Sequence, residues 1–173
     1  MNKGIRVGLA ASKLRLVIAV IPLVLVCRAF NADAQTETNL HSFGSVLNDG
    51  ATPEAGLVQG NDGNFYGTTD LGGTNNDGTV FQITSQGTLT SLWQFNGTNG
   101  KNPSAGLVLG SDGNFYGTTY RGGTNNDGTV FRIATNGTLT TLWQFGSDAT
   151  NGKNIPAGLV QGSDGNPPAP AAA

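Results

Sequence analysis

Cysteine and histidine are nearly missing from this chain of 173 residues, because Cys27 and His41 are single occurrences. Without a second cysteine the chain cannot form an internal disulfide or a thiolate metal site, so its stability must come from packing. No histidine cluster, Ser-His-Asp arrangement or Cys-His pair can be assembled. A complete Gly-Lys-Ser/Thr phosphate-binding motif is also lacking. We therefore predict a protein that is not an enzyme and has no cofactor.

Charged residues are scarce as well, at 12% of the sequence. From Gln35 onward there are four cations and ten acidic residues, which give this part a net charge of −6. A body this acidic has no basic surface for a phosphate backbone, so nucleic acid is excluded as a partner. Anionic lipid surfaces should repel it for the same reason.

Long hydrophobic runs are lacking too. The uncharged run Leu16–Cys27 has twelve residues, whereas a membrane-spanning helix needs about 20. Basic residues precede this run, and the small-x-small pattern Ala32-Asp33-Ala34 follows it. We predict that residues 1–34 are a signal peptide cleaved before Gln35, that the protein is exported to the periplasm, cell surface or medium, and that the mature chain has no membrane span. An uncleaved anchor and a lipoprotein at Cys27 are the alternatives.

Glycine, by contrast, is abundant, with 27 residues, and it lies within a long internal repeat. Residues 57–95 and 107–145 align without gaps at an offset of fifty, with 30 of 39 positions identical. A third copy begins at Ala157 and is followed through Asn166, after which a Pro/Ala tail occupies residues 167–173. Such self-similarity indicates a repeat architecture over residues 35–166.

Each repeat predicts four short strands, which in the first copy cover 56–59, 64–69, 79–84 and 88–95. The segments are rich in β-branched and aromatic residues, and turns are expected at 61–63 and 85–87, and at 111–113 and 135–137 in the second copy. Along 88–95, alternation places Leu89, Ser91, Trp93 and Phe95 on one face. Four strands per fifty residues is typical of a propeller blade, so the predicted fold class is all-β with propeller-like tandem blades.

Only two complete blades are predicted, at about 56–95 and 105–145, with a partial unit at 157–166 and single flanking strands at 38–43 and 157–161. Propellers typically use 4–8 blades. We therefore expect an incomplete array that cannot close by itself, so that the isolated chain is marginally stable, aggregates or assembles with copies of itself. His41 occupies the position of Trp93 and Trp143, which predicts a packing role for it.

The repeated motifs also carry a family resemblance. Ala-Gly-Leu-Val-x-Gly-x-Asp-Gly-Asn-Phe-Tyr-Gly-Thr-Thr, followed by Gly-Gly-Thr-Asn-Asn-Asp-Gly-Thr-Val-Phe, occurs twice almost intact. It resembles the bacterial GloVer tandem repeat of exported "choice-of-anchor" proteins, and the blades are similar to those of two-component-regulator propellers. The resemblance covers residues 38–166 and implies a propeller-like fold and a surface location, but no activity. This chain departs from the pattern in having few repeats and no recognisable C-terminal anchor.

Two groups of residues are candidates for ligand binding. The loop 72–79 resembles a calcium-binding β-roll unit, which makes Asp77 and Asp127 weak calcium candidates, although its repeat period is wrong and a simple surface loop explains it better. Asp62 and Asp112 are explained by turn chemistry. Tyr120 and Arg121 replace Asp70 and Leu71 and form a candidate ligand loop.

The predicted function is a structural or binding module outside the cell, with an unknown partner such as an extracellular polysaccharide or protein. The alternative is a carbohydrate-binding or carbohydrate-active propeller protein. Trp93, Trp143, Tyr66, Tyr116 and Tyr120 could then stack on sugars, whereas a packing role is the competing interpretation of the same aromatic residues.

Overall fold

A computed structural model describes residues 39–44, 49–146 and 152–162 of the chain. The chain divides into two compact units, 1–38 and 39–173. The first unit, which holds the predicted signal peptide, lies outside the described residues. Within the described part there is no helix long and apolar enough to cross a membrane.

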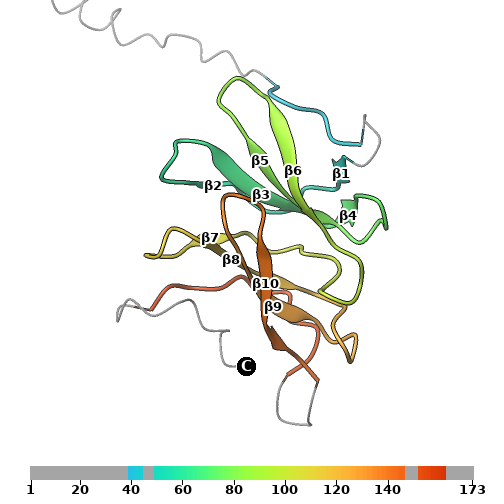
Figure 1. The fold of residues 1–173 in the computed structure, drawn as a ribbon. Coiled ribbons are helices and arrows are strands. Elements are labelled where there is room, and N and C mark those ends of the chain that lie inside the picture. Colours follow the sequence, from blue (N-terminus) through green and yellow to red (C-terminus); the bar gives the residue numbers. More distant parts are fainter. Residues whose placement is uncertain (1–38, 45–48, 147–151, 163–173) are drawn as a thin grey trace, which may run out of the picture. The chain divides into compact units, whose positions relative to one another are not determined.

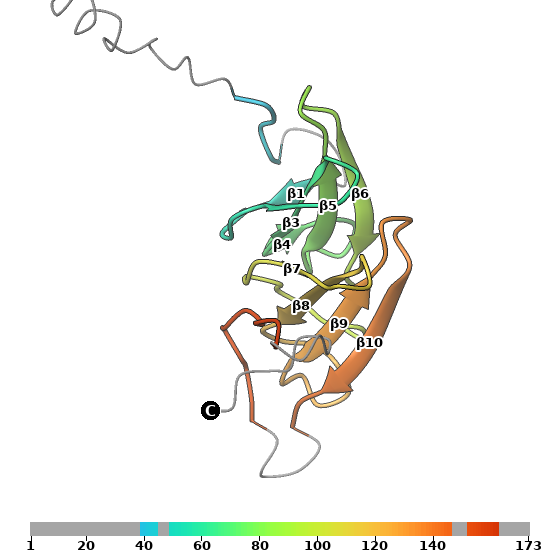
Figure 2. The same ribbon diagram turned by 90° about the vertical axis from the view of Figure 1, so that its left-hand side faces the viewer.

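Two four-stranded antiparallel sheets, one per repeat, form the body of the second unit (Figure 1). The first contains β2 (Val58–Gln59), β3 (Phe65–Thr69), β5 (Thr79–Ile83) and β6 (Leu89–Gln94), in that spatial order. The second contains β7 (Val108–Leu109), β8 (Phe115–Thr119), β9 (Thr129–Ile133) and β10 (Leu139–Gln144), also in chain order, as Figure 2 shows from the side. The predicted fold class of all-β, propeller-like tandem blades is confirmed.

The hairpin turns lie where Gly, Asn and Asp predict them. In the first, the Gly63 amide donates to the Gly60 carbonyl (3.0 Å) and the Gly60 amide donates to the Asn64 carbonyl (2.9 Å). Gly63 has φ of 81°, a left-handed conformation that glycine adopts without steric cost. The Gly87 amide closes the second turn on the Thr84 carbonyl (3.0 Å), and the second blade repeats both turns. The Asp-Gly signal therefore predicts this part of the blade correctly.

A β-bulge changes the predicted face pattern of the outermost strand. Val80 pairs with Trp93 and Phe81 pairs with Ser91, which leaves Leu92 as an extra residue. Opposed residues of paired strands share a face, and neighbours along a strand do not. Ser91 and Trp93 consequently lie on opposite faces, so the predicted shared face for Leu89, Ser91, Trp93 and Phe95 is wrong. The same shift recurs between Thr141 and Trp143 in β10.

The core lies between the two sheets. Tyr66 of β3 stacks on Phe115 of β8, with ring centroids 4.0 Å apart, and Phe95 meets Phe131 edge to face at 5.3 Å. Aromatic pairs of this kind add stabilisation beyond their buried area. The cluster is completed by Val80, Leu107 and Ile133. Packing between blades therefore holds the module together, as the near-absence of cysteine required.

The strand predicted at 38–43 is not formed in the described residues 39–43, and 157–161 contributes no strand either. Leu40–Phe43 runs as irregular backbone, yet its Phe43 ring packs on Phe81 with centroids 4.9 Å apart. An additional small sheet, unpredicted from the sequence, pairs β1 (Gly50–Ala51) with β4 (Leu71–Gly72). In the second repeat its counterpart is a single bridge between Lys101 and Arg121.

Candidate functional site: the inter-blade loops and the outer face of β10

Asp77, one of the two calcium candidates, is paired with a lysine. Its Oδ1 atom lies 2.8 Å from Nζ of Lys101, and the residue is only 8% exposed. Lys101 belongs to the segment that enters the second blade, so this ion pair connects that segment to a loop of the first blade.

The next residue, Asn102, extends this connection. Its backbone amide donates to the Asp77 carbonyl (3.0 Å), and its side-chain amide donates to the Asp70 carbonyl (3.1 Å). Asn102 has φ of 56°, and asparagine is one of the few residues that adopt the left-handed region readily. Further along, the Thr68 hydroxyl donates to the Ala105 carbonyl (3.0 Å) in a buried contact. We call Lys101 and Asn102, with these partners, the inter-blade clip.

The clip recurs after the second blade, with one weaker contact. Asn154 donates through its backbone to the Asp127 carbonyl (2.8 Å) and through its side chain to the Tyr120 carbonyl (3.0 Å). Lys153 is 3.7 Å from Asp127, and 65% of its side chain is exposed, compared with 40% for Lys101. Sequence reasoning missed the clip, although Gly-Lys-Asn at 100–102 and 152–154 is a visible signal for it.

The calcium interpretation gains no support from this geometry. A calcium site requires several oxygen ligands around one point. Asp77 and Asp127 lie in different blades, and each faces a lysine ammonium instead of other carboxylates. Among the residues that the structure describes, no three His, Cys, Asp or Glu side chains gather closely enough to hold a metal ion.

Tyr120 and Arg121, the candidate ligand loop, follow β8 directly. Arg121 is exposed, and its guanidinium carbon lies 5.7 Å from the centroid of the Tyr120 ring. Both backbone positions belong to the repeat scaffold, because Tyr120 bonds to Asn102 and Arg121 exchanges two hydrogen bonds with Lys101. The two side chains therefore change the chemistry of this edge while its backbone stays that of the first blade.

Asp62 and Asp112 have parallel roles within their own blades. The Tyr66 hydroxyl donates to Asp62 (2.7 Å) and lowers the pKa of that carboxyl, while burial raises the pKa of Tyr66. In the second blade, the hydrogen bond from Asn114 is the main cause of the lowered pKa of Asp112, and burial again raises the pKa of Tyr116. Both carboxylates also receive a backbone amide two residues on, which confirms their role in the turns.

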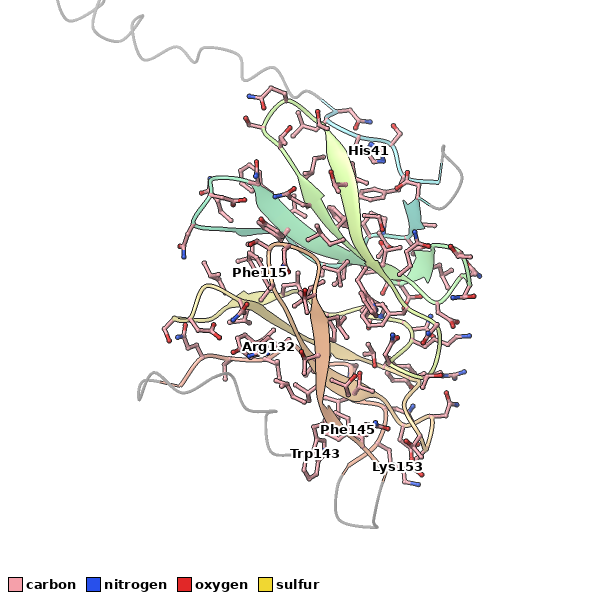
Figure 3. The ribbon with its side chains drawn as sticks, viewed as in Figure 1. His41, Phe115, Arg132, Trp143, Phe145 and Lys153 are labelled. Atoms are coloured by element: carbon pink, nitrogen blue, oxygen red, sulfur yellow. The ribbon has the colours of Figure 1, made fainter. Side chains whose placement is uncertain are left out.

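The aromatic residues proposed as a sugar platform divide into two groups. Tyr66 and Tyr116 are buried, and Trp93 packs against the core between the blades. Trp143, the repeat equivalent of Trp93, is 48% exposed, and its neighbour Leu142 is 44% exposed. Figure 3 labels Trp143 near the end of β10. Leu142 and Trp143 together form what we call the outer face of β10.

A shallow groove of about 400 Å³ runs along this face. Its lining residues are Thr124, Asn125, Thr141, Leu142, Trp143 and Gln144. The polar groups at one side are bonded to each other, because Gln144 Oε1 accepts from both the amide and the hydroxyl of Thr124, and Asn125 donates to the Phe145 carbonyl. The groove therefore offers mainly the apolar surface of Leu142 and Trp143.

The recurring four-stranded sheets, stacked through an aromatic core and joined by repeated clips, define an all-β tandem-repeat protein with propeller-like blades. The model of one family, described as the Gloeobacter/Verrucomicrobia repeat, matches residues 28–167. The chain belongs to this repeat family, which confirms the resemblance that its motifs indicate.

A crystal structure of selenomethionine-substituted virginiamycin B lyase from Staphylococcus aureus is similar to this chain, with 24% identity and a TM-score of 0.44. The match covers 64% of this chain and 31% of the lyase chain. A likeness this distant says nothing about the activity of the present protein. No curated protein is similar to the chain at a significant level.

Proposed function

We propose that this protein is an exported, non-enzymatic repeat module that acts outside the cell through surfaces of its blades. The observation that carries the proposal is the contrast between two equivalent surfaces. Trp93 packs between the blades, whereas Trp143 is 48% exposed on the outer face of β10. The chain thus presents an apolar contact surface of a kind that its own fold covers elsewhere.

Export rests on the basic N-terminal region, the twelve-residue apolar run and Ala32-Asp33-Ala34. Membership in the Gloeobacter/Verrucomicrobia repeat family is consistent with it. The test is to fractionate cells of a bacterial host and to sequence the N-terminus of the released protein. We expect a mature chain that begins at Gln35. A protein that stays in the cytoplasm with Met1 intact, or one lipidated at Cys27, would contradict the proposal.

A carbohydrate ligand is the second candidate, favoured by the exposed Trp143 beside amide and hydroxyl groups. An aromatic ring next to hydrogen-bonding groups can stack on a sugar and orient its hydroxyls. Against it stands the internal bonding of Thr124, Asn125 and Gln144, since sugar binding would have to compete with those bonds. Arg121 and Tyr120 offer another polar edge for such a ligand.

A polysaccharide pull-down with the full chain separates the two candidates. The matched variants are Trp143→Ala and Arg121→Ala, which leave the buried core unchanged. Retention on a polysaccharide that is lost in either variant would favour the carbohydrate candidate. Absence of retention across neutral and acidic polysaccharides is the result expected for a module that binds protein.

A further inference from the structure

The contact between the two blades shows what covers Leu92 and Trp93 of β6, the repeat equivalents of the outer face of β10. Leu92 and Trp93 of β6 pack against a cluster that includes Phe131 and Ile133 of β9, with Leu139 of β10 at its edge. The turn between β9 and β10 approaches Leu92 closely, since a Cβ built on Gly137 would lie 2.9 Å from the Leu92 carbonyl oxygen. The surface around Leu92 is thus covered by the β9–β10 hairpin of the next blade, which is the repeat equivalent of the β5–β6 hairpin.

At the outer face of β10 the equivalent hairpin is missing from the described residues, so Leu142 and Trp143 are exposed. Among the described residues, Leu159 covers the inner part of that side of the second blade, where it packs with Tyr116, Val130 and Phe145. The exposed Leu142 and Trp143 are the repeat equivalents of Leu92 and Trp93, which pack against the cluster that contains residues of β9.

The chain contains a second hairpin that resembles β9–β10 in sequence, namely β5–β6 of the first blade. The β5–β6 hairpin of the first blade has Phe81, Ile83 and Leu89 where β9–β10 has Phe131, Ile133 and Leu139. Leu40–Phe43 lies on it in the manner of a neighbouring blade, since Phe43 contacts Phe81 and a Cβ on Gly87 would lie 2.5 Å from the Leu40 carbonyl oxygen. Within the described part of the chain this short segment pairs with no strand, and its Leu40 is 43% exposed.

We propose that the outer face of β10 is a docking surface for a second copy of this chain, whose β5–β6 hairpin covers Leu142 and Trp143 in a head-to-tail contact. In the second copy, Leu40–Phe43 occupies the same β5–β6 hairpin that would dock on the first copy, so this segment is displaced when the copies dock. Burial of two large apolar side chains drives the association. Because the contact joins two different surfaces, it closes into a ring or extends as a chain, according to the rotation between copies. This inference deepens the proposed function of a blade-surface module.

The first experiment measures mass against concentration by light scattering on the purified full chain, together with tryptophan emission in a Trp93→Phe background. We expect association with rising concentration, accompanied by a blue shift of Trp143 emission. Trp143→Gln should abolish association, whereas Phe43→Ser, which removes the competing ring, should strengthen it at least several-fold. Val160→Gln, which removes a 69% exposed apolar side chain outside β10, is the control and should associate normally.

The second experiment tests the head-to-tail geometry. Leu89→Glu alters the hairpin, and Trp143→Gln alters the opposite surface, so each variant alone should be monomeric and an equal mixture should form dimers. Circular dichroism verifies that each variant retains its sheets. Self-association of Leu89→Glu alone would overturn the head-to-tail contact. A monomer at every concentration would overturn the docking surface altogether, and since purified chain is used, this result would leave the proposal of export standing.

Discussion

Lys101 and Asp77 form an ion pair of 2.8 Å that ties the start of the second blade to a loop of the first. The corresponding pair of Lys153 and Asp127 is longer, at 3.7 Å, and its lysine is more exposed. The chain therefore contains a strong and a weak version of one contact. Because of this difference, the contribution of the ion pair to the free energy of unfolding can be compared at two equivalent positions of one molecule.

We predict that Lys101→Met lowers the free energy of unfolding by about 1 kcal/mol, because a partly buried carboxylate loses its partner. Lys153→Met is the matched control and should change it by less than about 0.5 kcal/mol. Urea unfolding followed by circular dichroism gives both values. Equal losses in the two variants would mean that burial of Asp77 does not strengthen its ion pair.

Thr52 stands where the clip has Asn102 and Asn154, and it adopts the same left-handed conformation with φ of 59°. A β-branched side chain is strained there, whereas asparagine tolerates it. Thr52→Asn should therefore raise the free energy of unfolding by about 1 kcal/mol. The reverse substitution, Asn102→Thr, should lower it by more than that, since the hydrogen bond to the Asp70 carbonyl is lost as well. A thermal melt of both variants tests this, and a destabilised Thr52→Asn protein would contradict it.

The lowered pKa values of Asp62 and Asp112 predict a loss of stability in acid. At low pH the unfolded chain binds more protons than the folded one at these sites. Their contribution is thus complete above the ordinary carboxyl pKa of about 4 and is lost as the pH falls through the folded value. The double variant Asp62→Asn with Asp112→Asn should show a flatter decline of unfolding free energy between about pH 4 and 2. If the double variant shows the same decline of unfolding free energy as the original chain, the loss of stability in acid comes from other carboxyl groups.

The two buried tyrosines, Tyr66 and Tyr116, predict a loss of stability at alkaline pH. Burial raises the pKa of Tyr66 and of Tyr116, so the folded chain retains these protons longer than the unfolded chain. Their contribution is complete below the ordinary tyrosine pKa of about 10 and disappears as the pH rises through the raised values. Spectrophotometric titration of the Tyr66→Phe and Tyr116→Phe variants should show that each of these two tyrosines ionises above the ordinary tyrosine pKa. Ionisation of Tyr66 or Tyr116 at the ordinary tyrosine pKa would contradict the described burial.

The sequence predicted those parts of the blade that depend on local chemistry. Asp62-Gly63 places a left-handed glycine at a turn, and Thr79–Ile83 has the β-branched and aromatic pattern of a strand. The repeat itself predicted that Trp143 and Trp93 would occupy equivalent strand positions. Their different exposure was not predictable, because it depends on whether another sheet covers the position.

Other features escaped prediction because they depend on contacts distant in sequence. The bulge at Leu92 shifts the register of β6, and a prediction from strict alternation of side chains cannot include such a shift. The pairing of Gly50–Ala51 with Leu71–Gly72 joins segments with little strand propensity of their own. Among the site residues, Arg121 is exposed and Tyr120 is half-buried beside it. Asp77 belongs to the inter-blade clip, whose members are distant in sequence and meet only in the folded chain.

Ser91 presents the last test, because its hydroxyl is buried beside the bulge and has no hydrogen-bond partner among the residues that the structure describes. An unsatisfied buried hydroxyl loses its bonds to water and gains none in return. Ser91→Ala removes that group with little change in volume, so it should raise the free energy of unfolding by about 1 kcal/mol. Thr141→Ala, at the equivalent position of β10, is the control, and it should be neutral or destabilising because Thr141 is only partly buried and its hydroxyl is not among the buried groups without a partner. Urea unfolding of both variants decides the point, and a destabilised Ser91→Ala protein would show that the hydroxyl is satisfied in solution by a bound water.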